Sequence, residues 1–271
     1  MAPVRRKRRK KSEEPGRPVI EIGDGAAIPT KKDVGLFNAW WIAFFGSLAV
    51  VVCLIVFKPD PYLRIFAFVP DGIWVTFKVT VGSILLALVI GLFTGLGRLS
   101  THKIISGIAS LYVEVIRGIP LLVQLFYIYF ALGRIVQLPA MTSAIIAMAI
   151  CYGAYMGEIF RAGIQSIPKG QMEAARSLGM TKSQAMAQVI LPQAVKVILP
   201  PIGNEFVALL KDSSLVSILA VADLLRRGRE FAAETFTYFE TYTVVALVYL
   251  IITLFFSKLI SRMEERISAN R

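Results

Sequence analysis

The chain has 271 residues, 56% of them hydrophobic, and a mean hydropathy of +0.65. This composition excludes a soluble globular domain and indicates an integral membrane protein. The formal net charge is +12, but seven of the basic residues lie together between Arg5 and Lys11, so the rest of the chain carries only a modest excess.

The basic block is followed by a polar stretch with several prolines and glycines, at residues 12–33, whose composition is typical of disorder. Lysine and arginine close to an apolar span resist translocation, so the block predicts a cytoplasmic amino terminus. A nucleic-acid-binding arm would need aromatic side chains among the charges or a folded domain behind them. We therefore expect residues 1–38 to form a basic, disordered cytoplasmic tail that contacts the lipid bilayer and binds no nucleic acid.

Crossing a hydrocarbon core of about 30 Å takes about 20 apolar residues in a helix. The first such window is residues 39–57, and the segment that follows it at 58–72 is rich in proline and predicts an external loop. The second window is residues 73–97. Its Gly91 and Gly95 have the GxxxG spacing that lets two helices approach closely, although the tolerance of membrane helices for glycine explains this spacing equally well.

The third apolar stretch, at residues 104–132, is too long for a simple span, because an unbroken helix of this length would extend about 44 Å. Proline lacks an amide donor and clashes with the preceding turn, so we expect a break at Gly118 and Pro120. Glu114 and Arg117 stand three residues apart just before this break and could pair on one helix face.

The fourth span, at residues 140–163, has small side chains at intervals of three and four, which predicts a helix–helix seam. Glu158 belongs to this stripe and should therefore point into the bundle. A carboxylate there marks either a functional site or an ion pair with a basic residue such as Arg161. The stripe consists of Ala140, Ala144, Ala147, Cys151, Ala154, Glu158 and Ala162.

The fifth span, at residues 195–210, contains Pro200, Pro201 and Gly203, so we expect it to be bent or discontinuous. Broken helices inside a membrane face protein or a watery cavity, and transporters bind solutes at their ends. Polar groups on or next to the spans are therefore candidates for a solute path. These candidates are Gln124, Glu158, Asn204, Glu205, Lys211 and Asp212.

The sixth span is at residues 242–260, and a short cytoplasmic tail at 263–271 follows it. An even number of crossings returns the carboxyl terminus to the side of the amino terminus. Residues 165–188 then lie in the cytoplasm, in agreement with their basic side chains, whereas the arginines at 226–229 lie outside, against the positive-inside trend. The predicted fold is an all-α, multi-pass membrane protein with about six spans.

The segment at residues 170–192, between the fourth and fifth spans, has the sequence GQMEAARSLGMTKSQAMAQVILP. Its first part, residues 171–178, consists of good helix formers, and Gly179 is placed as a left-handed helix stop. Thr181 and Gln184 have the spacing of a capping box, which starts a second helix. Two short helices joined by a tight glycine turn predict a compact knob below the membrane.

The same segment resembles the coupling loop of binding-protein-dependent ABC importer permeases. The matching pattern is Glu173-Ala174-Ala175, Gly179 after three residues, and Val189-Ile190-Leu191-Pro192 after nine more, where the family more often has isoleucine at the position of Val189. The segments TFKVTVGS, EVIRGIPLLVQLF, YGAYMGEIFRAGIQSIPKGQMEAARSLG and GNEFVALLKDSSL resemble the polar amino-acid subfamily of these permeases.

This resemblance implies a five-helix type I importer core at residues 73–262, a coupling loop at about 164–192, and an extra amino-terminal helix at 39–57. It implies ATP-driven import, across a bacterial inner or plasma membrane, of a polar amino acid such as glutamate, glutamine, arginine, histidine or cystine. The implied partners are separate ABC ATPase subunits, a second permease subunit and an extracellular or periplasmic solute-binding protein. The residues that would couple to the ATPase are Glu173, Ala174, Ala175, Gly179, Leu191 and Pro192.

The sequence offers no catalytic set and no metal cluster, since it has one histidine, His102, and two cysteines, Cys53 and Cys151. It also lacks a GxxxxGK[ST] phosphate loop. We therefore expect no enzyme activity and no cofactor in this chain, with ATP and Mg²⁺ bound by the partner ATPase. The alternative function is an ion-coupled or passive amino-acid carrier or channel, which could also use Glu158 and a broken helix but leaves the knob without a role.

Overall fold

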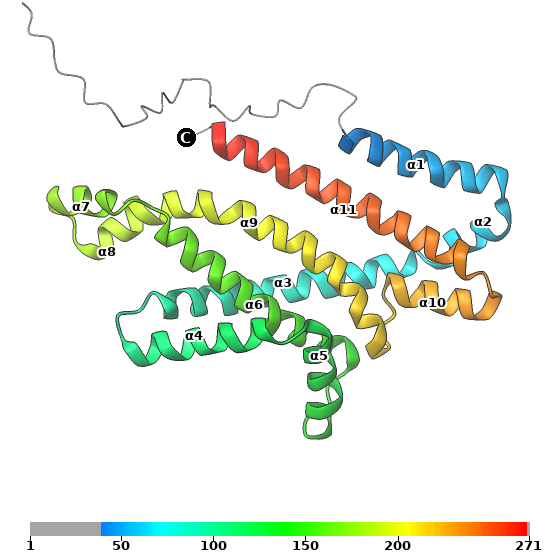
Figure 1. Cartoon of the computed structure of the whole chain (residues 1–271), viewed down its shortest axis with the longest axis horizontal. Coiled ribbons are helices and arrows are strands. Elements are labelled where there is room, and N and C mark those ends of the chain that lie inside the picture. Colours follow the sequence, from blue (N-terminus) through cyan, green and yellow to red (C-terminus); the bar gives the residue numbers. More distant parts are fainter. Residues whose placement is uncertain (1–38, 270–271) are drawn as a thin grey trace, which may run out of the picture. The chain divides into compact units, whose positions relative to one another are not determined.

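The computed structural model describes residues 39–269, and the predicted tail at residues 1–38 lies outside them. The described part of the chain is helical and has no strand, so the predicted all-α class is confirmed (Figure 1). Within it, five helical segments are long and apolar enough to cross a membrane, and a bent pair supplies a sixth span. The long helices are α1 (Ala39–Phe57), α3 (Asp71–Arg98), α6 (Ala140–Gln165), α9 (Leu191–Asp212) and α11 (Tyr238–Ala269).

The bent pair corresponds to the third apolar stretch of the sequence. It consists of α4 (Lys103–Gly118) and the segment Leu121–Arg134, which begins with α5 (Leu121–Phe126). The two halves are bent by 102°. The break falls at Ile119 and Pro120, between the two helices, so the predicted interruption of the third span is confirmed.

The side chain of Gln124 stabilises this break. Because Pro120 has no amide hydrogen, carbonyl groups before it lose a helical partner. Gln124 Nε2 replaces that partner by donating hydrogen bonds to the carbonyl oxygens of Ile116 at 2.9 Å and Ile119 at 2.8 Å. A buried glutamine therefore supplies a hydrogen-bond donor to two backbone carbonyls at the break, where lipid would offer none.

Helices α3 and α6 pack along a seam of small residues. A Cβ atom added at Gly91 would lie 2.3 Å from Met156 Cβ, and one added at Gly95 would lie 2.9 Å from the carbonyl oxygen of Gly157. No side chain larger than that of glycine fits at these distances, so the close approach predicted from the GxxxG spacing is confirmed. The small stripe of α6 is also buried at its middle positions, namely Ala144, Ala147, Cys151 and Ala154.

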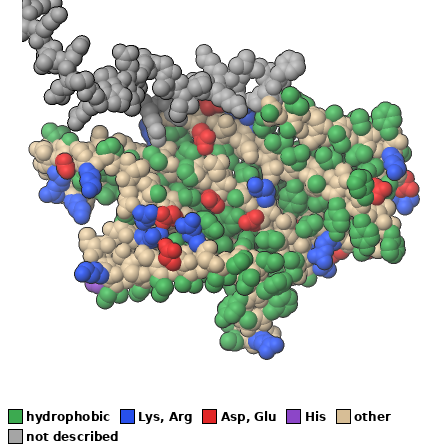
Figure 2. Space-filling model, in the orientation of Figure 1, with side chains coloured by type: hydrophobic (Ala, Val, Ile, Leu, Met, Phe, Trp, Pro, Cys, Tyr) green, Lys and Arg blue, Asp and Glu red, His purple; other side chains and the backbone are tan. Residues whose placement is uncertain are grey.

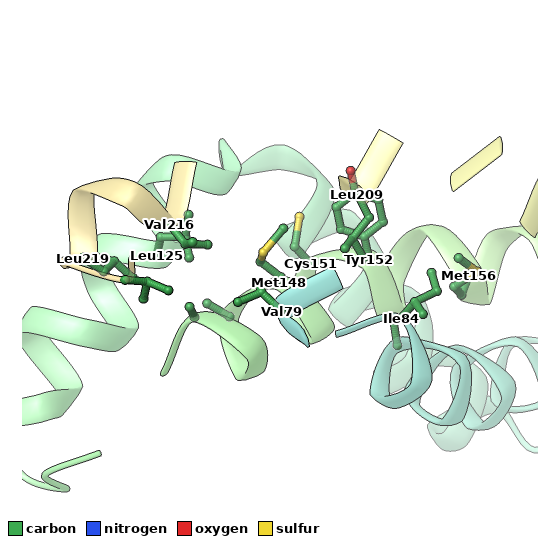
Figure 3. Packing of buried hydrophobic residues seen from close by; sticks show 14 residues of the cluster. Val79, Ile84, Leu125, Met148, Cys151, Tyr152, Met156, Leu209, Val216 and Leu219 are labelled. Carbon is green, nitrogen blue, oxygen red and sulfur yellow. The ribbon is translucent and has the colours of Figure 1, made fainter. Parts of the chain in front are cut away.

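The largest buried cluster lies where α3, α5, α6 and α9 meet (Figure 3). Packing holds this cluster together, because lipid tails are as apolar as the side chains and add little hydrophobic force between helices. The cluster includes Val79 and Ile84 from α3, Leu125 from α5, Met148, Tyr152 and Met156 from α6, Leu209 from α9, and Val216 and Leu219 from the 3₁₀ segment Ser213–Leu219.

Helix α9 decides between the two predicted forms of the fifth span, bent or discontinuous. It runs without a break from Leu191 to Asp212 and has Pro200 and Pro201 in its interior. Adjacent prolines remove only two amide donors, and packing against α6 and α11 stabilises the remaining turns. The helix curves along its length in Figure 1, which is the milder of the two predicted outcomes.

Most of the segment expected to be a loop at 58–72 is helical. It contains α2 (Pro59–Phe68), whose Tyr62 and Ile65 are buried in a cluster with Val244 of α11. Tertiary packing explains this helix, because apolar side chains at helical spacing in α2 contact α11, whereas the prolines at the start of α2 favour a loop in the sequence. The tail predicted at 263–271 continues α11 as far as Ala269.

Helix α10 (Leu224–Thr235) connects α9 to α11 and carries the arginines that the predicted topology places outside. Asp223 caps its first turn by accepting hydrogen bonds from the amides of Leu225 and Arg226. Glu230 forms ion pairs with Arg226 at 2.7 Å and with Arg227 at 3.4 Å. The positive charge of Arg226 and Arg227 is therefore partly compensated within α10.

Candidate functional site

The knob, which we define as α7 (Lys169–Ser177) and α8 (Lys182–Ala185) with the turn between them, has the geometry predicted from its sequence. Gly179 follows α7 with a φ of +85°, a left-handed conformation that glycine adopts without strain. The backbone amide of Gln184 donates to Thr181 Oγ1 at 3.3 Å, and the backbone amide of Thr181 donates to Gln184 Oε1 at 2.9 Å, which completes the capping box. Local hydrogen bonds therefore determine the shape of the knob.

The surface of the knob combines a charge with an apolar side chain. Glu173 and Ala174 are exposed, whereas Ala175 is only 5% exposed and packs inside the knob. Leu178 at the turn is 83% exposed, so its side chain is accessible for an apolar contact with a partner. Two further residues of the predicted coupling set are exposed at the start of α9: Leu191 and Pro192.

A second region is a cavity of about 410 Å³ at the break between α4 and α5, which we call the pocket. Elements far apart in the sequence contribute to it, because the break turns α5 away and leaves space between α4, α6 and α9. Apolar groups at the break and on α6 and α9 complete the lining. The charged and hydroxyl side chains of the pocket are Arg117 from α4, Tyr152 and Tyr155 from α6, and Glu205 and Asp212 from α9.

One guanidinium faces two carboxylates in the pocket. The Arg117 guanidinium lies over the ring of Tyr155, 5.1 Å from its centroid, and the Tyr152 hydroxyl donates to Asp212 Oδ2 at 2.8 Å. Among the described residues, Arg117 forms no ion pair with Glu205 or Asp212. The pocket therefore presents separated charges of both signs, with an excess of negative charge.

The structure brings some of the predicted solute-path residues together and leaves others apart. Glu205 and Asp212 both line the pocket. Gln124 lies behind it, buried at 6% exposure, where its Nε2 is 3.7 Å from Sγ of the pocket residue Cys151 and its Oε1 has no hydrogen-bond partner. Two other candidates are exposed on α9 and do not line the pocket: Asn204 and Lys211.

Glu158 takes part in an ion-pair cluster instead of lining the pocket. Its carboxylate accepts hydrogen bonds from Arg161, with Nε to Oε2 at 3.1 Å, and forms a second ion pair with Arg98 at the end of α3. Figure 2 shows acidic and basic side chains gathered between α6 and the α3–α4 pair. Of the two interpretations of Glu158 from the sequence, the geometry matches the ion pair, which links α3 to α6.

Sequence reasoning missed three polar groups of the pocket. Arg117 was considered only as a partner of Glu114, yet it extends toward Tyr155. Its position gave a signal that could have identified it, because a charged residue in an apolar stretch next to a helix break is typical of a solute path. Tyr152 and Tyr155 carried no such signal, since tyrosine is common in membrane helices.

The pocket has no set of groups that would hold a metal ion. Among residues 39–269, no group of three or more histidine, cysteine, aspartate or glutamate side chains has the required geometry. The two cysteines lie apart, with Cys53 exposed on α1 and Cys151 buried on α6. The arrangement is suited to reversible binding of a small charged solute.

Comparisons with known proteins agree with these features. Residues 87–269 match the family described as "Binding-protein-dependent transport system inner membrane component". The chain is similar to the glutamine transport system permease protein of Escherichia coli (strain K12), with 39% identity over 72% of this chain and 91% of the relative. It is also similar to the arginine transport system permease protein of Bacillus subtilis (strain 168), with 35% identity over 75% of this chain and 94% of the relative.

Among solved structures, the chain is similar to one described as an amino acid ABC transporter with histidines. The two chains are 47% identical, the TM-score is 0.71, and the match covers 76% of this chain and 95% of the solved one. The family match begins within α3, so α1 and α2 lie outside it.

Proposed function

Because the chain belongs to the family of binding-protein-dependent transport system inner membrane components, we propose that it forms the membrane-spanning part of an ATP-driven importer for polar amino acids. The family consists of multi-pass inner membrane proteins that are transport components and not enzymes. The observation that carries the proposal is the combination of a built knob at one end of the bundle with a charged pocket at a helix break.

In this proposal, separate ABC ATPase subunits bind ATP and Mg²⁺ and grip the knob. Closure of the ATPase pair would move α7 and α8, and with them α6 and α9, to which the knob is joined at both ends. Glu173 and Ala174 face outward for this contact, and Leu178 provides the apolar surface that the ATPase would cover. A ligand-driven movement of this kind requires the ATPase to contact the knob differently in its two states.

The knob end of the bundle is cytoplasmic in this arrangement, and both chain termini lie on the same side. A second permease subunit, identical or different, would complete the translocation path, and a solute-binding protein outside the membrane would deliver the amino acid. α1 would be an additional helix beside the importer core, since it lies outside the family match.

The pocket is our candidate for a solute site on this path. Its guanidinium suits the carboxylate of an amino acid, and its two carboxylates suit an ammonium or guanidinium group. The excess negative charge favours a cationic or zwitterionic amino acid over an anionic one.

Uptake by proteoliposomes tests this proposal. The full-length chain, reconstituted with its ATPase, its second permease subunit and its binding protein, is supplied with radiolabelled arginine, histidine, glutamine or glutamate. We expect uptake only when ATP is present on the side of the membrane where the ATPase lies. Among the four amino acids, we expect glutamate to be transported least. Uptake driven by a sodium or proton gradient without ATP would favour the ion-coupled carrier and reject the importer.

A further inference from the structure

A further cavity in the described part of the chain is separate from the pocket. It has a volume of about 760 Å³ and runs along a groove between α9 and α11. It shares no lining residue with the pocket and is not needed for the proposed solute path. Its function therefore requires a separate explanation.

The groove narrows toward the middle of the bundle. There α9 and α11 come close together, and a Cβ atom added at Gly203 would lie 2.9 Å from Cγ1 of Ile260. Around this point the lining is apolar on both helices, with Leu199 and Phe206 on either side of Gly203 on α9 and Leu259 on α11. Leu199 and Leu259 are 39% and 55% exposed, so the groove is open to whatever surrounds the protein.

The other end of the groove is basic. Lys196 lies in the second turn of α9, close to the knob, and Arg262 and Arg266 stand one turn apart on α11. All three line the cavity. Glu264 and Glu265 are on the same helix but are not part of the lining, so the charged side chains among the described lining residues are all basic.

An apolar groove with three cations at one end matches the shape of an anionic phospholipid. The phosphate would lie among the cations at the knob end, and the acyl chains would extend toward Gly203. Clusters of basic side chains at the cytoplasmic surface of membrane helices attract anionic headgroups. The leaflet follows from the proposed cytoplasmic position of the knob.

A second copy of this chain is a less suitable occupant. Two copies in one membrane have the same orientation, so a two-fold symmetric interface along the groove would bring its basic end near the basic end of the other copy. Like charges brought together in a desolvated interface oppose association. A phosphate, in contrast, accepts hydrogen bonds from basic side chains.

We propose that the groove between α9 and α11 binds an anionic phospholipid of the cytoplasmic leaflet, with Lys196, Arg262 and Arg266 holding its headgroup. Because α9 connects the knob to the pocket, the bound lipid contacts the helix that would transmit movement between them. A lipid at this place would make the importer sensitive to the anionic lipid content of its membrane.

Photo-cross-linking tests the site. The full-length chain is placed in phosphatidylcholine nanodiscs that contain photoactivatable phosphatidylglycerol, and the cross-linked peptides are identified by mass spectrometry. We expect cross-links within α9 and the last part of α11, and we expect unlabelled phosphatidylglycerol, but not phosphatidylcholine, to compete. Each basic residue near a membrane surface contributes about fivefold to the affinity for an anionic lipid. The double variant Arg262→Gln with Arg266→Gln should therefore bind phosphatidylglycerol about 30-fold more weakly in the competition experiment.

Two further variants make the test specific. Lys103→Gln with Arg229→Gln removes the same charge from exposed positions outside the groove and should leave the cross-links unchanged. Leu199→Trp keeps all three cations but fills the apolar part, and it should reduce cross-linking within the groove.

Three outcomes would overturn the proposal. One is equal competition by phosphatidylcholine, and another is equal cross-linking in the paired arginine variant and the wild type. The third is a disulfide between Leu199→Cys residues of two copies in native membranes, which would show that a second copy occupies the groove.

Discussion

The knob and the pocket are built in opposite ways. All of the knob comes from one short stretch of sequence, and its shape depends on the positive φ of Gly179 and on the capping box of Thr181 and Gln184. The pocket takes its polar groups from α4, α6 and α9, which meet only after the bundle has packed. Local sequence therefore specifies the part that would receive force, whereas tertiary packing specifies the part that would hold a solute.

The largest effect should come from the knob turn. Gly179→Val places a β-branched residue in a left-handed conformation that it strongly disfavours, although a Cβ atom there would meet no neighbour within 4 Å. We expect ATP-driven uptake to fall below detection while the protein still inserts into the membrane. Gly179→Asn is the matched control, because asparagine tolerates this conformation, and it should retain most uptake. An equal loss of uptake in both variants would show that the left-handed backbone conformation at residue 179 is not the cause of the loss.

The second effect concerns the pocket. Glu205→Gln removes one of its two carboxylates with little change in shape, so we expect the KM for a cationic amino acid to rise about tenfold with a smaller change for glutamine. The measurement is uptake at varied solute concentration. Asn204→Ala, at the adjacent exposed position, should leave KM unchanged. An unchanged KM in Glu205→Gln would remove this carboxylate from the solute site.

The third effect tests the non-local packing that shapes the pocket. In Gly91→Ala the new methyl group would lie 2.3 Å from Met156 Cβ, so α3 and α6 must separate. We expect a loss of about 3 kcal/mol in stability, measured by thermal unfolding in detergent. Gly107→Ala is the control, because a Cβ atom there meets no neighbour within 4 Å, and it should unfold at or above the wild-type temperature. Similar unfolding temperatures of the two variants would contradict the close packing of α3 against α6 at this seam.

The smallest effect depends on pH. Burial raises the pKa of Asp223 from 3.8 to about 6, although amide and hydroxyl donors around it act in the opposite direction. The folded state therefore holds a proton that the unfolded state releases between these values, and the free energy of unfolding falls as pH rises through this window. We expect the wild type to lose about 2 kcal/mol more than Asp223→Asn between pH 4 and pH 7, as measured by thermal unfolding. Parallel pH profiles would show that burial does not perturb this carboxyl group.

The predictions that succeeded depend on residues with a strong local effect. Pro120 lies at the break between α4 and α5, Gly179 ends α7, and the Thr181 capping box starts α8. The spacing of Gly91 and Gly95 indicated the seam for a similar reason, because glycine is the residue that allows two backbones to touch.

The outcomes that the sequence left open or missed required knowledge of neighbours. Of the two predicted forms of the fifth span, bent or discontinuous, α9 has the continuous one, because α6 and α11 pack against it. The segment at 58–72 is helical because Tyr62 finds a place against α11. Likewise, only the folded bundle brings Arg117 toward Tyr155 and Glu205, so the composition of the pocket could not be derived from sequence spacing.

The most direct test of the account is contact between the knob and an ATPase. Ser177→Cys introduces an exposed thiol at the end of α7 with almost no change in size, and Cys53→Ala removes the exposed native thiol. In native membranes, a bifunctional thiol reagent should join this position to the ATPase subunit, and ATP should change the yield. Absence of any cross-link to an ATPase, with and without ATP, in membranes that still transport the amino acid would contradict coupling through the knob.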